Sequence, residues 1–299
     1  MPHTRPGRKG FPAAVPRGRP FVKMHGLRNH FAIVDAREQA FRPAADELAR
    51  LCDVQVGIGA DQLVVVEPPS EDARAAGAVA FARFWNTDGR EAEACGNATR
   101  CVAWLLFEES GASAAAVETR AGVLSCRRAG RDRVRTTMGR VSMEWRDVPL
   151  AEPRDTVHLD FRCGPLSDPA ALSVGNPHLV FFVDDFEAID LAKLAPQIQR
   201  DPLFPQQVNV GVAQMLAHDE LRLAVYERGA GLTMACGSGA CAAAYAALAR
   251  GLTDARSLAV QLPGGRLDVE ITPDGTAAIT GPVAWCYAGW LPAPGGGGS

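Results

Sequence analysis

Short apolar runs that recur along the chain, separated by polar residues and turn formers, predict a protein rich in β-strands. These runs lie at residues 31–36, 62–67, 179–185, 221–227 and 258–263. Two longer segments, 96–110 and 237–251, begin with small residues and continue as apolar sequence without a helix breaker, which predicts two helices. Because both segments are apolar on nearly all sides, we expect these helices to be buried.

The two halves of the chain resemble each other. The sequence Ala-Cys-Gly-Asn at 94–97 matches Ala-Cys-Gly-Ser at 235–238, and the two cysteines are 141 residues apart. Asn29 lies before one apolar run, and Asn176, 147 residues later, lies before another. A weaker third match relates Gln62 to Gln214. Three landmarks in one order suggest an ancient duplication; the alternative is chance similarity between glycine-rich helix starts.

Length and charge favour an ordinary globular protein with a small-molecule partner. The 299 residues, 47% of them hydrophobic, suffice for two domains or one large one. A formal charge of −3 gives no basic field for nucleic acid, and no apolar run approaches the ~20 residues that span a membrane. The three lysines, Lys9, Lys23 and Lys193, lie outside the cysteine motifs, which argues against a pyridoxal cofactor.

The cysteines and the two ends of the chain bear on its location. Eight cysteines without a signal peptide favour reduced thiols in the cytoplasm. No Cys-x-x-Cys spacing occurs, so we expect no metal site; a zinc site would need scattered ligands. The composition of residues 1–20 predicts a disordered basic tail, although a transit peptide would look partly similar. The composition of residues 293–299 predicts a flexible tail or an engineered linker.

Cys95 and Cys236 are the strongest candidates for chemistry. A cysteine at a helix N-terminus faces unpaired backbone N–H groups and the positive end of the helix dipole, which lower its pKa. Two such cysteines in duplicated halves suit the inversion of a stereocentre, in which one removes an α-proton while the other protonates the opposite face. The amides that follow them can bind a carboxylate. We expect the other six cysteines to be structural.

The motifs together resemble the diaminopimelate epimerase family across nearly all of residues 21–292. The matching segments are 21–35, 57–67, 86–103, 175–185 and 226–244, and the two cysteine motifs with the Glu-Arg-Gly-Ala-Gly run are the most specific. The resemblance implies an α/β fold of the α+β type, with two pseudo-symmetric halves. Each half would be a curved, mainly antiparallel sheet around a central helix. We assign residues 21–140 plus 281–292 to the first half and 141–280 to the second.

The resemblance also implies an activity and a set of site residues. A cytoplasmic homodimer would interconvert LL- and meso-diaminopimelate without a cofactor, on the route to lysine and peptidoglycan. Cys95 and Cys236 would be the acid/base pair, with His178 and Glu227 tuning them. The substrate would contact Asn29, Gln62, Asn86, Gly96, Asn97, Asn176, Asn209, Glu227, Arg228, Gly237 and Ser238. Asn86, Asn176, Asn209 and Arg228 would hold its distal end, where a guanidinium can grip a carboxylate.

Several alternatives stay open at this stage. Asn86 and Asn176 could be turn residues, and Glu227 and Arg228 a surface ion pair. Arg28 and His30 stand where the family commonly has glycine and aspartate, which keeps a racemase for another amino acid, such as histidine or glutamate, in play. A non-catalytic amino-acid sensor would not need two helix-start cysteines, whereas a thiol-redox protein would work through a disulfide between them.

Overall fold

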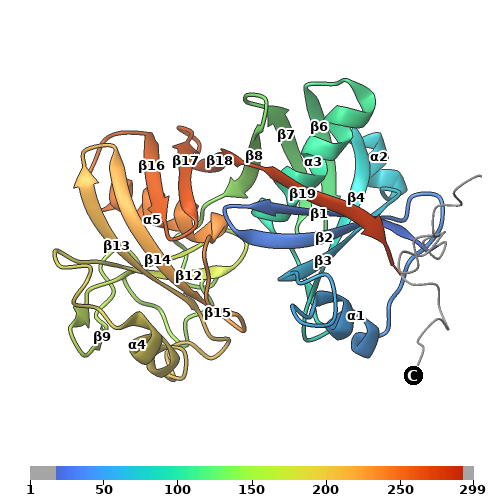
Figure 1. Cartoon of the computed structure of the whole chain (residues 1–299). Helices are drawn as coiled ribbons and strands as arrows, with labels where there is room; N and C mark the ends of the chain where they lie inside the picture. Colours follow the sequence, from blue (N-terminus) through green and yellow to red (C-terminus); the bar gives the residue numbers. More distant parts are fainter. Residues whose placement is uncertain (1–17, 292–299) are drawn as a thin grey trace, which may run out of the picture.

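The computed structural model describes residues 18–291 as two halves, each with one helix enclosed by strands (Figure 1). The enclosed helices are α3 (Gly96–Ser110) and α5 (Gly237–Ala249), both at their predicted positions. One continuous sheet of 17 strands runs through both halves. The predicted α+β fold with pseudo-symmetric halves is therefore confirmed. The predicted tails, residues 1–20 and 293–299, lie outside the described residues except for 18–20, and the first strand begins at Pro20.

The first half holds nine strands and three helices. Its strands are β1 (Pro20–Gly26), β2 (Asn29–Asp35), β3 (Gln62–Glu67), β4 (Ala78–Asn86), β5 (Glu91–Ala92), β6 (Ala114–Thr119), β7 (Gly122–Arg128), β8 (Arg133–Arg140) and β19 (Ala284–Trp290). Besides α3, its helices are α1 (Ala45–Cys52) and α2 (Glu71–Ala75).

The second half holds ten strands and two helices. Its strands are β9 (Arg162–Cys163), β10 (Leu166–Ser167), β11 (Ala170–Ser173), β12 (Pro177–Phe182), β13 (Asn209–Ala217), β14 (Glu220–Glu227), β15 (Gly231–Leu232), β16 (Ser257–Leu262), β17 (Gly265–Ile271) and β18 (Thr276–Pro282). Besides α5, its helix is α4 (Leu191–Ile198).

The strands pair in the same order in both halves. In the first half, β1 pairs antiparallel with β2, β2 parallel with β3, β3 antiparallel with β4 and β4 parallel with β6. Antiparallel pairings then connect β6 to β7 and β7 to β8. The same succession connects β11, β12, β13, β14, β16, β17 and β18. This shared pattern confirms the two-fold repeat and corrects one landmark. Gln62 opens β3 as Asn209 opens β13, so Gln62 corresponds to Asn209, and the match to Gln214 is wrong.

Two pairings join the ends of this repeat. β8 runs antiparallel to β18, with Thr136 opposite Ile279, and this contact forms the seam between the halves. β19 returns to the first half and pairs with β1 (Figure 1). We propose the division at residues 140/141 and 280/281; its second boundary lies within β18.

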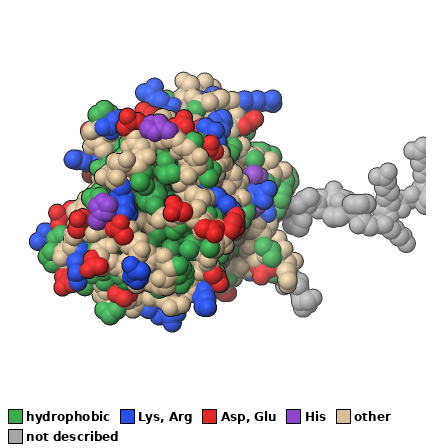
Figure 2. All heavy atoms as spheres, turned by 90° about the vertical axis from the view of Figure 1, so that its left-hand side faces the viewer, with side chains coloured by type: hydrophobic (Ala, Val, Ile, Leu, Met, Phe, Trp, Pro, Cys, Tyr) green, Lys and Arg blue, Asp and Glu red, His purple; other side chains and the backbone are tan. Residues whose placement is uncertain are grey.

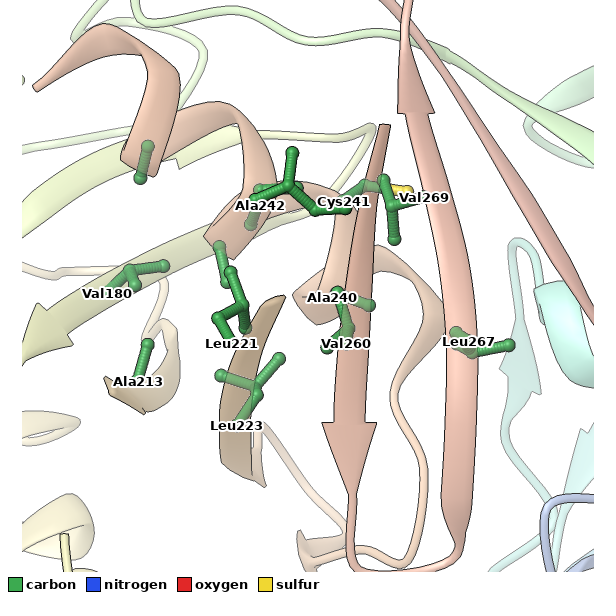
Figure 3. Packing of buried hydrophobic residues seen from close by; sticks show 14 of the residues in the cluster. Val180, Ala213, Leu221, Leu223, Ala240, Cys241, Ala242, Val260, Leu267 and Val269 are labelled. Atoms are coloured by element: carbon green, nitrogen blue, oxygen red, sulfur yellow. The ribbon is translucent and has the colours of Figure 1, made fainter. Parts of the chain in front are cut away.

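In each half, the sheet buries side chains on both of its faces. In β2, Phe31 and Ile33 pack with α3, whereas the alternate residues Ala32 and Val34 pack with α1. The second half repeats this arrangement with α5 on one face and α4 on the other. Small residues such as Ala240 let strands close in on α5, where Leu223 and Val260 contact the same cluster (Figure 3). Burial by the surrounding strands explains why α5 and the greater part of α3 are apolar.

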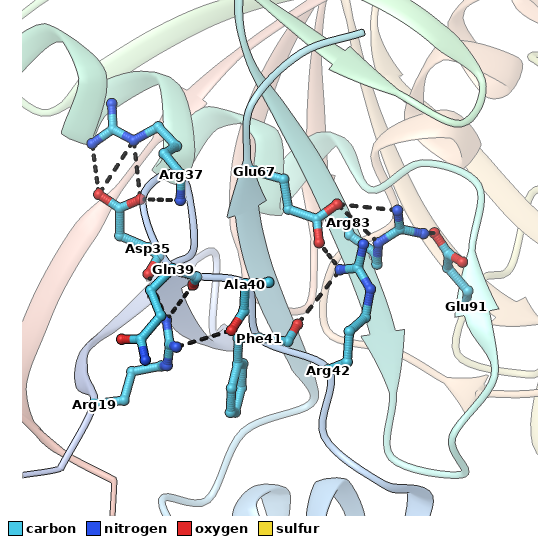
Figure 4. A network of polar contacts seen from close by, with 10 residues as sticks. All are labelled: Arg19, Asp35, Arg37, Gln39, Ala40, Phe41, Arg42, Glu67, Arg83 and Glu91. Atoms are coloured by element: carbon cyan, nitrogen blue, oxygen red, sulfur yellow. Dashed lines mark hydrogen bonds and ion pairs between the residues drawn. The ribbon is translucent and has the colours of Figure 1, made fainter.

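Ion pairs brace the segment that leads to Cys95. Arg83 on β4 pairs with Glu67 at 3.1 Å and with Glu91 at 2.6 Å, and Arg42 also pairs with Glu67 (Figure 4). Glu91 belongs to the short strand β5, which ends three residues before Cys95. On the outer face of the second half, acidic and basic side chains are interspersed (Figure 2). Among residues 18–291, no helix is long and apolar enough to cross a membrane.

Candidate active site

Both candidate cysteines cap the N-terminus of an enclosed helix. Cys95 precedes α3 with an extended backbone (φ −146°, ψ 104°), and Cys236 precedes α5 in a similar conformation (φ −115°, ψ 108°). The backbone N–H of Gly239 donates to the Cys236 sulfur at 3.3 Å. A capping residue of this kind satisfies one of the N–H groups that every helix leaves unpaired.

The two helix starts meet the same pair of residues at the seam. A Cβ added to Gly96 would lie 2.9 Å from Met138 Sδ and 3.1 Å from Ile279 Cδ1. A Cβ added to Gly237 would lie 3.1 Å from Ile279 Cδ1 and 3.9 Å from Met138 Cε. Met138 lies on β8 and Ile279 on β18, one on each side of the seam. Glycine after each cysteine therefore lets both helices approach this place closely.

The side chain of Asn97 connects the two cysteine segments directly. Its Nδ2 donates to the backbone oxygen of Ala235 at 3.0 Å and to Asn29 Oδ1 at 3.2 Å. Ala235 immediately precedes Cys236, and Asn29 Oδ1 lies 4.0 Å from the Cys95 sulfur. One buried amide thus ties the start of α3 to the start of α5.

Burial controls the ionisation of both thiols. It raises the pKa of Cys95 to about 11 and the pKa of Cys236 well above its usual value. The helix N–H groups act in the opposite direction: those of Ala98 and Asn97 lower the pKa of Cys95, and the hydrogen bond from Gly239 lowers that of Cys236. The sequence predicted this lowering contribution but not its size; the expected net lowering of the pKa is wrong because desolvation is larger.

Glu227, the last residue of β14, lies where its charge acts on both sulfurs. Its carboxylate raises the pKa of Cys236 and of Cys95, and the Cys236 thiol is within hydrogen-bonding reach of it. Thr233 Oγ1 donates to Glu227 Oε1 at 2.5 Å. Burial raises the pKa of Glu227 itself. A carboxyl group with a raised pKa beside a thiol is suited to exchange a proton with it.

His178 is buried next to the second helix start. Its Nε2 lies 3.0 Å from Ser238 Oγ and 3.1 Å from Asn176 Oδ1. Burial and then the charge of Arg228 lower the pKa of His178 to about 3, so its ring is neutral at physiological pH. His178 therefore orients Ser238 and Asn176 rather than supplying a positive charge to Cys236.

The remaining predicted residues form two pairs at strand ends. Gln62 Nε2 donates to Asn86 Oδ1 at 2.8 Å across the first residue of β3 and the last of β4. In the second half, Asn209 Oδ1 accepts the backbone N–H of Arg228, the residue that follows the end of β14, at 2.8 Å. The Gln62 oxygen Oε1 is buried with no hydrogen-bond partner in the described residues, so it is free to accept a hydrogen bond.

These residues make contacts beyond those that the simpler interpretations require. Asn86 ends a strand and accepts a side-chain hydrogen bond, so it is more than a turn residue. Asn176 contacts buried His178. The Arg228 guanidinium donates to the backbone oxygen of Gln206 at 2.8 Å, and within residues 18–291 it makes no ion pair with Glu227. In the described range no hydrogen bond joins Gln62 or Asn86 to either cysteine.

The unusual residues Arg28 and His30 leave Asn29 in place. Leu27 and Arg28 turn the β1–β2 hairpin with left-handed backbones (φ 55° and 63°), as a two-residue hairpin turn requires. Asn29 Nδ2 donates to Asp61 Oδ2 at 3.0 Å, and the backbone N–H of His30 donates to the same oxygen at 2.7 Å. Arg28 is exposed. The sequence analysis did not identify Asp61, the residue directly before Gln62.

Other residues that shape the site also escaped the sequence analysis. Thr233 holds Glu227, and Met138 separates the two helix starts. Nothing in the spacing of either residue signals a function. The third, Arg100, did leave a signal, because it is a charged residue within the buried segment 96–103 of α3. Over residues 18–291, no group of three or more His, Cys, Asp or Glu side chains is placed to hold a metal ion.

Comparison with known proteins places the chain in a family. Residues 21–144 and 170–286 match the sequence model described as diaminopimelate epimerase. The diaminopimelate epimerase of Phenylobacterium zucineum (strain HLK1) is 50% identical over 279 residues, covering 92% of this chain and 98% of that protein. The diaminopimelate epimerase of Caulobacter vibrioides (strain NA1000 / CB15N) is 44% identical over 286 residues, with coverage of 92% and 98%.

Solved structures share the fold at low sequence identity. A hydroxyproline epimerase from Agrobacterium vitis superimposes with a TM-score of 0.63 at 16% identity, covering 91% of this chain and 92% of that one. A PhzF-family phenazine biosynthesis protein from Bacillus anthracis gives 0.63 at 15% identity, with coverage of 91% and 98%. The sequence relatives, which match almost end to end, show that this chain belongs to the diaminopimelate epimerase family.

Proposed function

We propose that this chain interconverts LL- and meso-diaminopimelate, with Cys95 and Cys236 as the acid/base pair. The observation that carries the proposal is the meeting of the two cysteine-capped helices at one seam, joined by the Asn97 side chain. The relatives named diaminopimelate epimerase, which match more than nine-tenths of the chain, supply the substrate.

In the proposed reaction, the α-carbon of the substrate loses a proton from one face and gains another on the opposite face. One cysteine, as thiolate, removes the α-proton and becomes a thiol, while the other thiol protonates the opposite face of the carbon and becomes a thiolate. Because burial raises the pKa of both thiols, one must first lose its proton, and the Glu227 carboxylate, which interacts with Cys236, would accept it. The amides after each cysteine would hold the substrate α-carboxylate and stabilise the charge that develops on deprotonation.

The distal end of the substrate would be bound by polar residues at the strand ends. Asn86 and Asn176 present amides there, and Asn209 fixes the backbone of Arg228. For Arg228 to grip a carboxylate, its guanidinium must leave the backbone oxygen of Gln206. Diaminopimelate carries a second amino-carboxylate group at this end, whereas a smaller amino acid would leave these groups unpaired.

We also propose that the protein is a cytoplasmic homodimer. Its eight cysteines are all unpaired thiols, which suits a reducing compartment. Trp285, Tyr287 and Trp290 on β19 are about half exposed, and exposed aromatic side chains of this kind are enriched at protein interfaces. Sedimentation of the purified protein would measure the oligomeric state.

The decisive experiment is turnover in heavy water under reducing conditions. Starting from LL-diaminopimelate, deuterium should enter the meso product first while recovered substrate stays unlabelled, because two different groups handle the two protons. Cys95→Ser and Cys236→Ser should each abolish turnover, whereas Cys286→Ser on exposed β19 should not. Early label in the substrate, or activity that survives both site substitutions, would refute the two-cysteine mechanism. Histidine and glutamate as competing substrates test the specificity.

A further inference from the structure

Arg100 is a buried cation for which the mechanism above gives no role. It lies in α3, it is 0% exposed, and it is the largest fully buried side chain among the described residues. No acidic side chain within residues 18–291 forms an ion pair with it. A buried charge without a counter-charge costs several kcal/mol, so its presence calls for a compensating use.

The fold provides a closely fitted slot for the guanidinium. A Cβ added to Gly281 on β18 would lie 3.1 Å from Arg100 Cζ, and a Cβ added to Gly26 on β1 would lie 3.2 Å from Nη2. The two walls of the slot therefore come from β1 and from β18, the strand within which the second boundary between the halves lies. The nitrogen Nε has no hydrogen-bond partner there, so the slot does not satisfy the group completely.

The strongest contact of Arg100 is to Asn97. Its Nη2 donates to Asn97 Oδ1 at 2.7 Å, and Nη1 donates more weakly to the backbone oxygen of Gly96 at 3.4 Å. Because the amide oxygen of Asn97 is engaged in this way, its NH₂ group must point to the opposite side. That is the side on which Asn97 reaches Ala235 and Asn29.

The charge of Arg100 also reaches the nearby thiols. It lowers the pKa of Cys95, against the larger effect of burial, and it acts in the same direction on Cys126 and Cys241. The titratable and charged groups around Arg100 and Cys95 are Cys95 and Cys101 near or on α3, Cys126 on β7, Arg133 on β8, Glu227 on β14 and Cys241 on α5. Of these neighbours, Glu227 is the only carboxylate, and it acts on Cys95 rather than pairing with Arg100.

We propose that Arg100 is a positioning residue for the proton transfer: it fixes the Asn97 side chain across the seam and favours negative charge on the Cys95 sulfur. The proposal rests on Cys95 acting as described under the proposed function. It assigns to one buried side chain both the alignment of the two helix starts and part of the electrostatic balance between the two thiols.

Three variants separate charge from geometry. Arg100→Gln removes the charge, whereas Arg100→Lys keeps it but loses the planar guanidinium that holds Asn97. Asn97→Asp keeps Arg100 and the shape of residue 97, cancels the charge locally and removes the donor to Ala235. Alkylation of Cys95 by iodoacetamide, followed by mass spectrometry of its peptide over a range of pH, reports the thiolate fraction at that sulfur.

The proposal predicts a distinct pattern among these variants. In Arg100→Gln and Asn97→Asp the pKa of Cys95 rises by about one unit, so alkylation at a fixed pH below it slows about five- to tenfold. In Arg100→Lys the alkylation profile stays near that of the unchanged chain while kcat falls at least tenfold. A merely structural role would lower Tm in all three variants and leave the Cys95 profile of the folded protein unchanged.

Two results would overturn the proposal. One is an unchanged Cys95 alkylation profile in folded Arg100→Gln; should that variant not fold, an unchanged profile in Asn97→Asp decides the question. The other is a full kcat in Arg100→Lys. Failure of the proposed function would look different, since Cys95→Ser would then retain turnover whatever the alkylation profiles show.

Discussion

A single methyl group at Gly96 should impair catalysis far more than it impairs stability. The added Cβ would lie 2.9 Å from Met138 Sδ and 3.0 Å from Met138 Cε, where ordinary contacts of such atoms are about 3.5–4.0 Å. Met138 or the start of α3 must therefore move by roughly 0.5–1 Å. Overpacking of this kind costs about 1–3 kcal/mol of unfolding free energy, partly offset by the ~1 kcal/mol by which helices favour alanine over glycine.

The consequence for activity follows from where the displacement occurs. A shift of about 1 Å between reacting groups can lower the rate about 100-fold. We therefore expect Gly96→Ala to lose about 1 kcal/mol of stability in urea unfolding and about 10- to 100-fold in kcat. Gly237→Ala should lose less, because its Cβ would be 3.9 Å from Met138 Cε. Shortening the obstacle in the double variant Gly96→Ala/Met138→Ala should restore part of the lost kcat.

Gly111 provides the matched control at the other end of the same helix. It caps α3 with a left-handed backbone (φ 72°), and no atom lies within 4 Å of the position of an added Cβ. Gly111→Ala should lose about 1 kcal/mol through backbone strain and keep its kcat. Equal kcat losses in Gly96→Ala and Gly111→Ala, or a wild-type kcat in Gly96→Ala, would refute the reasoning.

Three further outcomes are expected. Arg228→Lys should raise KM for diaminopimelate about tenfold or more in steady-state assays with a smaller change in kcat, because a lysine cannot grip a carboxylate with two parallel hydrogen bonds; a KM that stays constant would remove Arg228 from the site. Burial lowers the pKa of His178 from 6.5 to about 3, so between these pH values the unfolded chain binds a proton at His178 and the native chain does not. The free energy of unfolding therefore falls as the pH decreases through this window, by about 2 kcal/mol between pH 7 and pH 5 in urea unfolding. His178→Asn should lack that part of the loss. Oxidation should inactivate the enzyme by joining Cys95 to Cys236, and dithiothreitol should restore it. Peptide mass spectrometry of the oxidised protein should find this disulfide, and inactivation without it would point to a different sulfur.

The sequence predicted the elements and the cysteine positions because both leave local signals. Helix starts with glycine after cysteine and long apolar segments are visible in a window of a few residues, and both helices begin where expected. The repeat was also detectable, but Gln62 was aligned with Gln214 because sequence similarity carried no information on strand register. Only the order of strand pairings identifies Asn209 as its equivalent.

What the sequence could not predict depends on contacts between distant segments. The pKa of each thiol follows from burial by strands of both halves, which outweighs the local helix N-terminus that the sequence does reveal. The role of the Asn97 side chain depends on Ala235, which lies 138 residues away. Sequence analysis assigned Asn97 through its backbone amide alone, since that group's position is set by the helix.

The return of β19 to β1 constrains how the protein is made. β1 is synthesised before every other strand of the described chain, yet its neighbour on one side is the last of these strands, β19. Until that strand has been synthesised, β1 exposes a free edge of backbone N–H and C=O groups, which invites pairing with other chains. The first half therefore cannot complete its sheet until the strands of the second half have been synthesised.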